Sequence, residues 1–179
     1  MAIRTMTLSS GDGKWTTGWH QLTVTDAKPG VWEGPEKTKK FIDLFFDGYP
    51  ETFRLRVYEA FSKDNEEFAM ARFFKVANAG ILDELKDANG KSVLQFDDDP
   101  ENLKGSSFNV LFYKNEEGYM RAWDRIAPVV ADTPLKYSAE DVKFWKSNSR
   151  EAYAKRFGES LDNSSTSGNT KGDGDDLPF

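Results

Sequence analysis

Apolar and polar residues alternate with a period of two in three consecutive stretches of the N-terminal half of the chain. Successive side chains of a β-strand point to opposite faces, so each alternation predicts a strand with one buried face. The stretches cover residues 15–25, 40–46 and 52–58. We expect the first strand to end at the turn signal Lys28–Gly30, and a loop over Gly34–Thr38 to lead into the second. The residues predicted to face the core are Leu22, Val24, Ile42, Leu44, Phe46, Phe53, Leu55 and Val57.

The pattern changes to a helical period after the third stretch. Apolar residues recur at positions i, i+3, i+4, i+7 and i+11, which places them in one stripe along a helix. They are Met70, Phe73, Phe74, Ala77 and Ile81. Asp64 and Glu67 predict a capped start, and Gly80 predicts the end of this helix. Pro100, preceded by Asp99, predicts the first turn of another short helix.

Strand alternation returns at residues 107–113, and a turn over 114–118 leads to a further stretch at 119–126. These two stretches predict a hairpin. Ser138 and Asp141 then predict a capped final helix that reaches Phe157.

The predicted element order is strand, strand, strand, helix, strand, strand. That is the order of the five-stranded OB barrel, whose helix falls between its third and fourth strands. We therefore expect a mainly β protein with an OB-fold domain over residues 1–135 and a C-terminal helix over residues 136–157. A small mixed α/β sandwich is the alternative fold.

From Gly158 onward the composition becomes polar and rich in Ser and Gly. Such a segment buries too little apolar surface to offset the entropy of ordering, so residues 158–179 are predicted to form a disordered acidic tail. The tail carries −4 of the net charge of −6, which leaves −2 for residues 1–157. Because the body is nearly neutral, the charge of the whole chain does not exclude a nucleic-acid partner.

The chain ends in an acidic run that finishes with Leu-Pro-Phe. A partner's apolar pocket with a basic rim can bind the phenylalanine ring, the proline and the terminal carboxylate together. The preceding aspartates add long-range electrostatic attraction to the basic rim. This tip resembles the acidic end of the bacterial single-stranded DNA-binding protein family, in which Asp, an aliphatic residue, Pro and Phe come last. The resemblance implies binding of single-stranded DNA and recruitment of replication, recombination and repair proteins through the tip. The alternative is a solubilising tail. The predicted docking residues are Asp173, Asp175, Asp176, Leu177, Pro178 and Phe179.

The body of the chain resembles the divergent single-strand binders carried by phages, particularly over Glu67–Gly80. It lacks the usual N-terminal strand sequence of the bacterial family. The tetrameric assembly of that family is therefore not carried over, and whether the protein is a homo-oligomer stays open.

A single-strand binder needs aromatic faces on which bases stack and cations near the phosphate path. Aromatic and basic residues interleave on the predicted outer faces of the second, third and last strands, and in the loop before the second. The alternative for each aromatic residue is a place in the core, since aromatics are often buried. The predicted DNA-binding residues are Trp32, Lys37, Lys39, Lys40, Phe41, Phe45, Arg54, Arg56, Tyr58, Tyr119, Arg121 and Trp123.

Catalytic side chains are scarce in this sequence. The sequence contains one histidine, His20, and no cysteine. A metal site built from several histidines and a catalytic Cys–His pair are therefore both excluded. The run Asp97–Asp99 fits a helix start better than a cation site. We expect no enzyme activity, no metal and no cofactor. The absence of cysteine, of a long apolar run and of an export signal predicts a cytoplasmic protein without membrane contact, in a bacterium or a phage-infected bacterium.

The leading interpretation is a non-enzymatic protein that coats single-stranded DNA in replication, recombination and repair. The second is an interaction adaptor whose OB-fold binds no DNA and whose tail docks to a replication or repair enzyme. A nuclease that uses carboxylates and a metal comes third.

Overall fold

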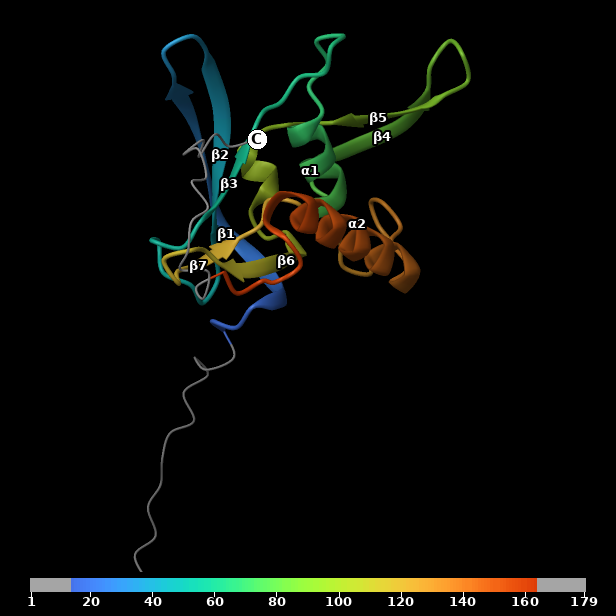
Figure 1. Cartoon of the computed structure of the whole chain (residues 1–179). Coiled ribbons are helices and arrows are strands. Elements are labelled where there is room, and N and C mark those ends of the chain that lie inside the picture. Colours follow the sequence, from blue (N-terminus) through green and yellow to red (C-terminus); the bar gives the residue numbers. More distant parts are fainter. Residues whose placement is uncertain (1–13, 164–179) are drawn as a thin grey trace, which may run out of the picture.

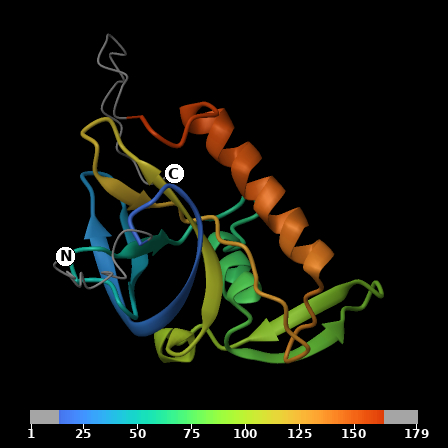
Figure 2. The same cartoon turned by 90° about the horizontal axis from the view of Figure 1, so that it is seen from below.

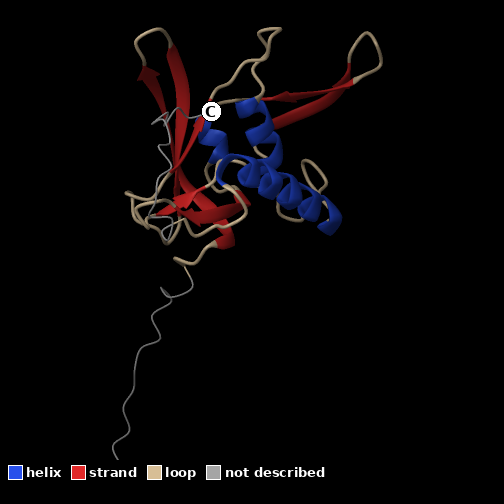
Figure 3. Cartoon of the chain, viewed as in Figure 1, coloured by secondary structure: helices blue, strands red, loops and turns tan. Residues whose placement is uncertain are grey.

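Residues 14–163, which the computed structural model describes, form a five-stranded antiparallel sheet, a two-stranded hairpin and two α-helices (Figures 1 and 3). The protein is therefore mainly β, as the sequence predicted. The larger sheet has the strand order β3-β2-β1-β6-β7, with β3 and β7 at its two edges. Its strands are β1 (Gly18–Glu33), β2 (Thr38–Phe46), β3 (Leu55–Tyr58), β6 (Ser107–Lys114) and β7 (Met120–Ala122).

Strand β1 is the centre of the sheet and changes partner along its length. Its first part, from Gly18 to Thr23, pairs with β6, and its second part, from Val24 to Glu33, pairs with β2. The register shifts between Val24 and Asp26, where the strand passes from one partner to the other. Such an irregularity bends a strand and increases its twist. One long, bent strand therefore joins the two halves of the sheet.

The predicted end of this strand at Lys28–Gly30 is wrong, because β1 continues through Pro29, which lies opposite Ile42 of β2. In the described residues this part of β1 has a paired strand on one side only. Proline is tolerated at such an edge, where no neighbouring strand needs its missing N–H. The chain reverses later, where the backbone N–H of Gly34 donates to the carbonyl of Lys37 at 2.9 Å.

The core lies under the inner face of β1, β2 and β3. All eight residues that the alternation assigned to that face are buried, which confirms their facing. The third strand is shorter than predicted, because β3 begins at Leu55 and Phe53 lies in the turn before it. Helix α1 (Ala69–Ala77) closes this core with Phe73 and Phe74, two residues of the predicted apolar stripe. Phe108 of β6 packs edge-on against Phe73, so the two halves of the sheet share one core.

Helix α1 begins near the predicted start and ends earlier than predicted. The carboxylate of Glu67 accepts hydrogen bonds from the backbone N–H groups of Met70 and Ala71, at 2.8 and 3.1 Å. The helix ends at Asn78, whose φ of 57° lies in the left-handed region. Ile81 therefore belongs to the next strand and not to the helix.

A hairpin that the sequence analysis did not anticipate follows α1. It consists of β4 (Ile81–Lys86) and β5 (Ser92–Phe96) and projects from the body of the molecule (Figure 1). Leu82 and Leu85 are exposed on it, so it has no buried face along most of its length. Burial of one face is what produces a readable alternation, and its absence explains why this pair was missed.

Helix α2 (Ala139–Phe157) runs along one side of the molecule (Figure 2) and has the predicted capping box. The Ser138 hydroxyl accepts from the backbone N–H of Asp141, whose carboxylate accepts from the backbone N–H of Ser138. Tyr153 of α2 packs with Leu111 and Trp123 in a second apolar cluster on the other side of β6. The predicted short helix is the 3-10 turn η1 (Pro100–Leu103), capped by Asp99.

No helix among residues 14–163 combines the length and the apolar character needed to span a membrane.

Candidate nucleic-acid interface

The face of β1, β2 and β3 that points away from the core carries most of the predicted DNA-binding residues. Residues that lie opposite each other in an antiparallel pair point to the same face, so the register gives the arrangement of side chains. We call this surface the outer face. Its cross-strand rows are Trp32 with Lys39, then Gly30 with Phe41 and Tyr58, then Lys28 with Asp43 and Arg56.

Two aromatic rings lie side by side in the middle row. The ring centres of Phe41 and Tyr58 are 5.6 Å apart, and both side chains are half-buried. Phe41 lies directly over Gly30, where an added Cβ would come within 2.3 Å of its ring. Glycine is therefore needed at position 30 for the ring to pass this close to the strand. We call these two half-buried rings the aromatic platform.

Arg56 lies above this platform. Its guanidinium carbon is 3.9 Å from the centre of the Phe41 ring. It also donates two hydrogen bonds to Asp43, from Nε to Oδ1 at 2.7 Å and from Nη2 to Oδ2 at 2.8 Å. The hydrogen bonds to Asp43 raise the pKa of Arg56, so the guanidinium is charged and held in place.

A small hollow lies where β3 and β7 approach each other at the edges of the sheet. It has a volume of about 270 Å³ and brings together Arg54, Arg56 and Arg121. The side chain of Arg54 is 47% exposed and forms a long ion pair with Asp43, at 3.5 Å. The predicted arginines of two distant strands therefore meet at one place. We call this the edge hollow; its other lining residues are Thr52, Phe53 and Met120.

The turn between β1 and β2 extends the outer face. Trp32 is half-buried there and packs over Gly34, where an added Cβ would come within 2.4 Å of the indole ring. The pKa of Lys39 is lowered by partial burial and by the nearby charge of Lys37, and Glu59 opposes this shift. These lysines form a basic end to the outer face.

Three predicted site residues lie away from the aromatic platform and the edge hollow. Lys40 alternates with Phe41 along β2, so it points to the opposite face, beyond the end of the core. Phe45 lies at the other end of the outer face, where Lys28 Nζ is 5.1 Å from its ring centre. Tyr119 is 62% exposed in the turn before β7.

Trp123 is buried, and the structure does not place it on a surface with Arg121. It is only 6% exposed and packs against Tyr153 of α2, with the two rings perpendicular at 5.6 Å. The regular ladder of β7 ends at Ala122, so the alternation read through this stretch does not continue into position 123. Of the two alternatives weighed for the aromatic residues, Trp123 takes the core position.

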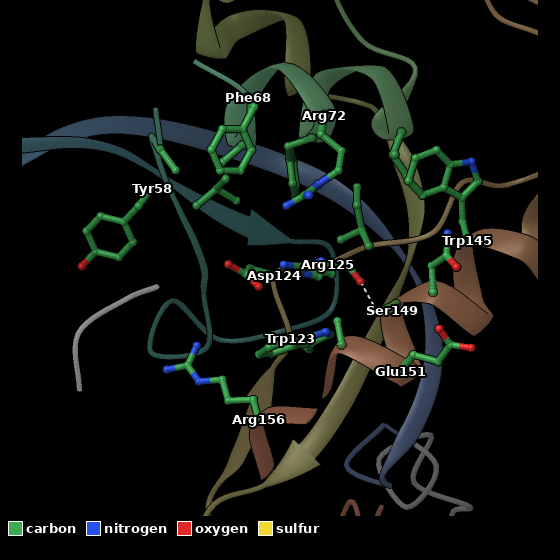
Figure 4. A pocket seen from close by; sticks show the side chains of 18 of the residues that line it. Tyr58, Phe68, Arg72, Trp123, Asp124, Arg125, Trp145, Ser149, Glu151 and Arg156 are labelled. Atoms are coloured by element: carbon green, nitrogen blue, oxygen red, sulfur yellow. Dashed lines mark hydrogen bonds between the residues drawn. The ribbon is translucent and has the colours of Figure 1, made fainter. Parts of the chain in front are cut away.

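A second, larger hollow of about 710 Å³ opens between β3, α1, the segment after β7 and α2 (Figure 4). We call it the helix hollow. Phe68 and Arg72 come from the start of α1, Asp124 and Arg125 from the segment after β7, and Trp145 from α2. Sequence reasoning missed these residues because they come from separate segments, none of which has a pattern of its own.

The charges in the helix hollow influence one another. Burial lowers the pKa of Arg72, and the neighbouring Arg125 lowers it further, while Asp124 and Glu67 oppose the shift. Asp124 reaches solvent at the hollow, yet the surrounding protein desolvates it and raises its pKa, against the influence of Arg125 and Arg72. Both shifts have desolvation as their largest cause, although Asp124 and Arg125 are exposed and only Arg72 is half-buried.

The predicted docking tip, Asp173–Phe179, lies outside the described residues. Within residues 14–163, no three or more His, Asp or Glu side chains gather closely enough to hold a metal ion. Comparison of the chain with models of protein families, with curated proteins and with solved structures found no match.

Proposed function

We propose that this protein binds single-stranded DNA on the outer face, and that its C-terminal tip recruits other proteins of DNA metabolism. The observation that carries the proposal is the platform of Phe41 and Tyr58 beside the three arginines of the edge hollow. Stacking on aromatic rings and attraction of phosphates by cations are the two requirements for binding a single strand without reading its sequence. Here the rings lie on β2 and β3, and the arginines line the edge hollow between β3 and β7.

The strand connectivity supports the proposal. If β4 and β5 are set aside as an insertion, β1, β2, β3, β6 and β7 run in the order of the five OB strands, with α1 between the third and fourth. The central strand divides its pairing between β2 and β6, as a strand at the bend of a barrel does. We therefore interpret the sheet as an OB-like barrel open between β3 and β7. OB-folds bind oligonucleotides on the face of their second and third strands, which here carries the aromatic platform.

The charge of Arg56 contributes less than its position suggests. Asp43 neutralises much of it, so we assign Arg56 to holding the Phe41 ring and assign the phosphates mainly to Arg54 and Arg121. Lys39, at the start of β2, extends the cationic path in the other direction. A strand of DNA lying across the sheet would then pass from the edge hollow over the platform toward Trp32.

The experiment is a titration of fluorescently labelled oligo-dT and of a duplex of equal length, followed by anisotropy. We expect preference for the single strand and a fall in affinity with salt, with a log–log slope of about −0.7 for each phosphate contact. Replacing Arg54 or Arg121 with Ala reduces the slope by about one contact each. Lys91→Ala, in the exposed turn between β4 and β5, is the matched control and leaves binding unchanged. Absence of binding to either DNA would favour the adaptor interpretation.

A further inference from the structure

We propose that the helix hollow is a second nucleotide subsite, in which Arg72 receives a phosphate and Phe68 receives a base of the strand that continues from the outer face. The inference rests on the proposed function, because the outer face must deliver the strand. The two surfaces share one residue, Tyr58, which belongs to the aromatic platform and also lines the helix hollow.

Arg72 is the main reason for assigning an anion to this hollow. It is half-buried on α1, and its guanidinium points into the hollow toward Asp124 and Arg125 (Figure 4). Within residues 14–163 the guanidinium forms no hydrogen bond and no ion pair. A partly desolvated arginine without a direct partner is costly, and a planar five-donor group suits a phosphate. Its surroundings therefore fit an anionic ligand.

The neighbouring cations strengthen this assignment. Arg125, Lys155 and Arg156 also line the hollow, against the acidic residues Asp124, Glu59 and Glu151. Glu59 already accepts a hydrogen bond from the backbone N–H of Lys40, at 2.8 Å. The basic residues outnumber the acidic ones by a single charge, so the hollow suits one phosphate better than a run of them. A single nucleotide of a strand that leaves the outer face at Tyr58 meets that condition.

The walls of the hollow provide surfaces for a base. Phe68 is 45% exposed, although it is a large apolar side chain at the start of α1. Trp145 of α2 lines the opposite side (Figure 4). The buried indole Nε1 of Trp123, also in the wall, has no hydrogen-bond partner among the described residues. Every base has a π face, so an exposed ring beside a cation accepts any of them.

The test compares two hollow variants of the full chain, Arg72→Gln and Phe68→Ala, with two matched controls. Lys75→Gln removes a charge from the same helix outside the hollow, and Phe144→Ala removes an exposed ring of α2 that does not line it. Each protein is titrated with labelled oligo-dT of about 5 and about 15 nucleotides, lengths that span the range of OB-fold site sizes. Circular dichroism during heating checks that each variant is folded.

We expect the hollow variants to lose about fivefold or more in affinity for the long oligonucleotide, as for one lost stacked base, and to bind the short one like wild type. If both hollow variants bind each oligonucleotide like their controls while Arg54→Ala weakens binding, the proposed subsite is wrong and the outer face remains the DNA-binding surface. If wild type binds no single strand at all, the proposed function itself is wrong.

The tail tip is the alternative occupant of the helix hollow. If the effect of Arg72→Gln disappears in a Phe179→Ala background, the tip occupies the hollow and the nucleotide assignment is overturned.

Discussion

Arg56 and Asp43 face each other across β3 and β2 and form a two-pronged ion pair, with N···O distances of 2.7 and 2.8 Å. The same guanidinium covers the Phe41 ring at 3.9 Å. One acidic residue therefore holds the cation that lies against the Phe41 ring of the aromatic platform. A carboxylate on a surface that receives phosphates repels them, so Asp43 has two opposite effects on DNA binding.

Replacing Asp43 with Asn separates these two effects. We expect the free energy of unfolding to fall by about 1 kcal/mol, as for loss of a well-aligned and partly exposed ion pair. DNA affinity at low salt should rise, because the face loses one negative charge and Arg56 becomes available to phosphates. Urea denaturation and oligo-dT anisotropy measure the two quantities. Asp47→Asn, in the exposed turn after β2, is the control for removing an acid. An unchanged affinity for Asp43→Asn would show that the strand does not cross this part of the face.

Trp123 and Tyr119 test where the aromatic residues act. Trp123→Ala removes a buried ring from the cluster beneath α2, and we expect it to cost about 3–5 kcal/mol of stability. Tyr119→Ala removes a ring that is 62% exposed, so stability should stay within about 0.5 kcal/mol of wild type. Urea denaturation distinguishes the two. If Trp123→Ala is as stable as wild type but binds DNA more weakly, Trp123 is a DNA-binding residue and not a core residue.

The C-terminal tip is tested by two variants with different charges. Removal of residues 173–179 should abolish binding to partner proteins while DNA affinity is kept or rises, since an acidic tail competes with phosphates at an effective concentration in the millimolar range. Phe179→Ala keeps every charge and removes only the ring, so partner binding should collapse while DNA affinity stays near wild type. Pull-down from a bacterial lysate and anisotropy measure the two properties. Retention of all partners by Phe179→Ala would reduce the tail to a competing polyanion.

Tyr137 makes stability depend on alkaline pH. Its hydroxyl donates to the carbonyl of Lys75 at 2.6 Å, and burial, with the charge of Asp141, raises the pKa to about 12. The unfolded chain ionises this group near pH 10, so stability falls as pH rises from about 10, and the loss is complete only above about 12. Wild type should lose about 1 kcal/mol more than Tyr137→Phe between about pH 8 and pH 11. Urea denaturation at the two pH values measures this. Equal losses would contradict it, and Tyr119→Phe serves as the exposed control.

The sequence by itself determined the elements whose signal is local. Strands β2 and β3 have one buried face, so apolar and polar residues alternate along them, and this alternation predicted both strands. All eight residues predicted to point inward are buried. The capping box of Ser138 and Asp141 and the cap of Asp99 were predictable because each depends on residues within one turn. The grouping of Phe41 and Tyr58 on one outward face followed from the same alternation.

Only the tertiary structure decided the rest, because each remaining feature depends on which segments meet. Pro29 is tolerated within β1 because that half of the strand is paired on one side only. The local sequence does not show how many neighbours a strand has. Trp123 is buried because α2 covers the other side of β6. Both faces of β6 are enclosed, so alternation of apolar and polar residues no longer distinguishes an inner from an outer face there. Arg54 and Arg121 meet because the two edges of the sheet approach each other, and Arg72 reaches the helix hollow because four separate segments enclose it. Periodicity assigns a side chain to a face, and long-range packing decides what that face meets.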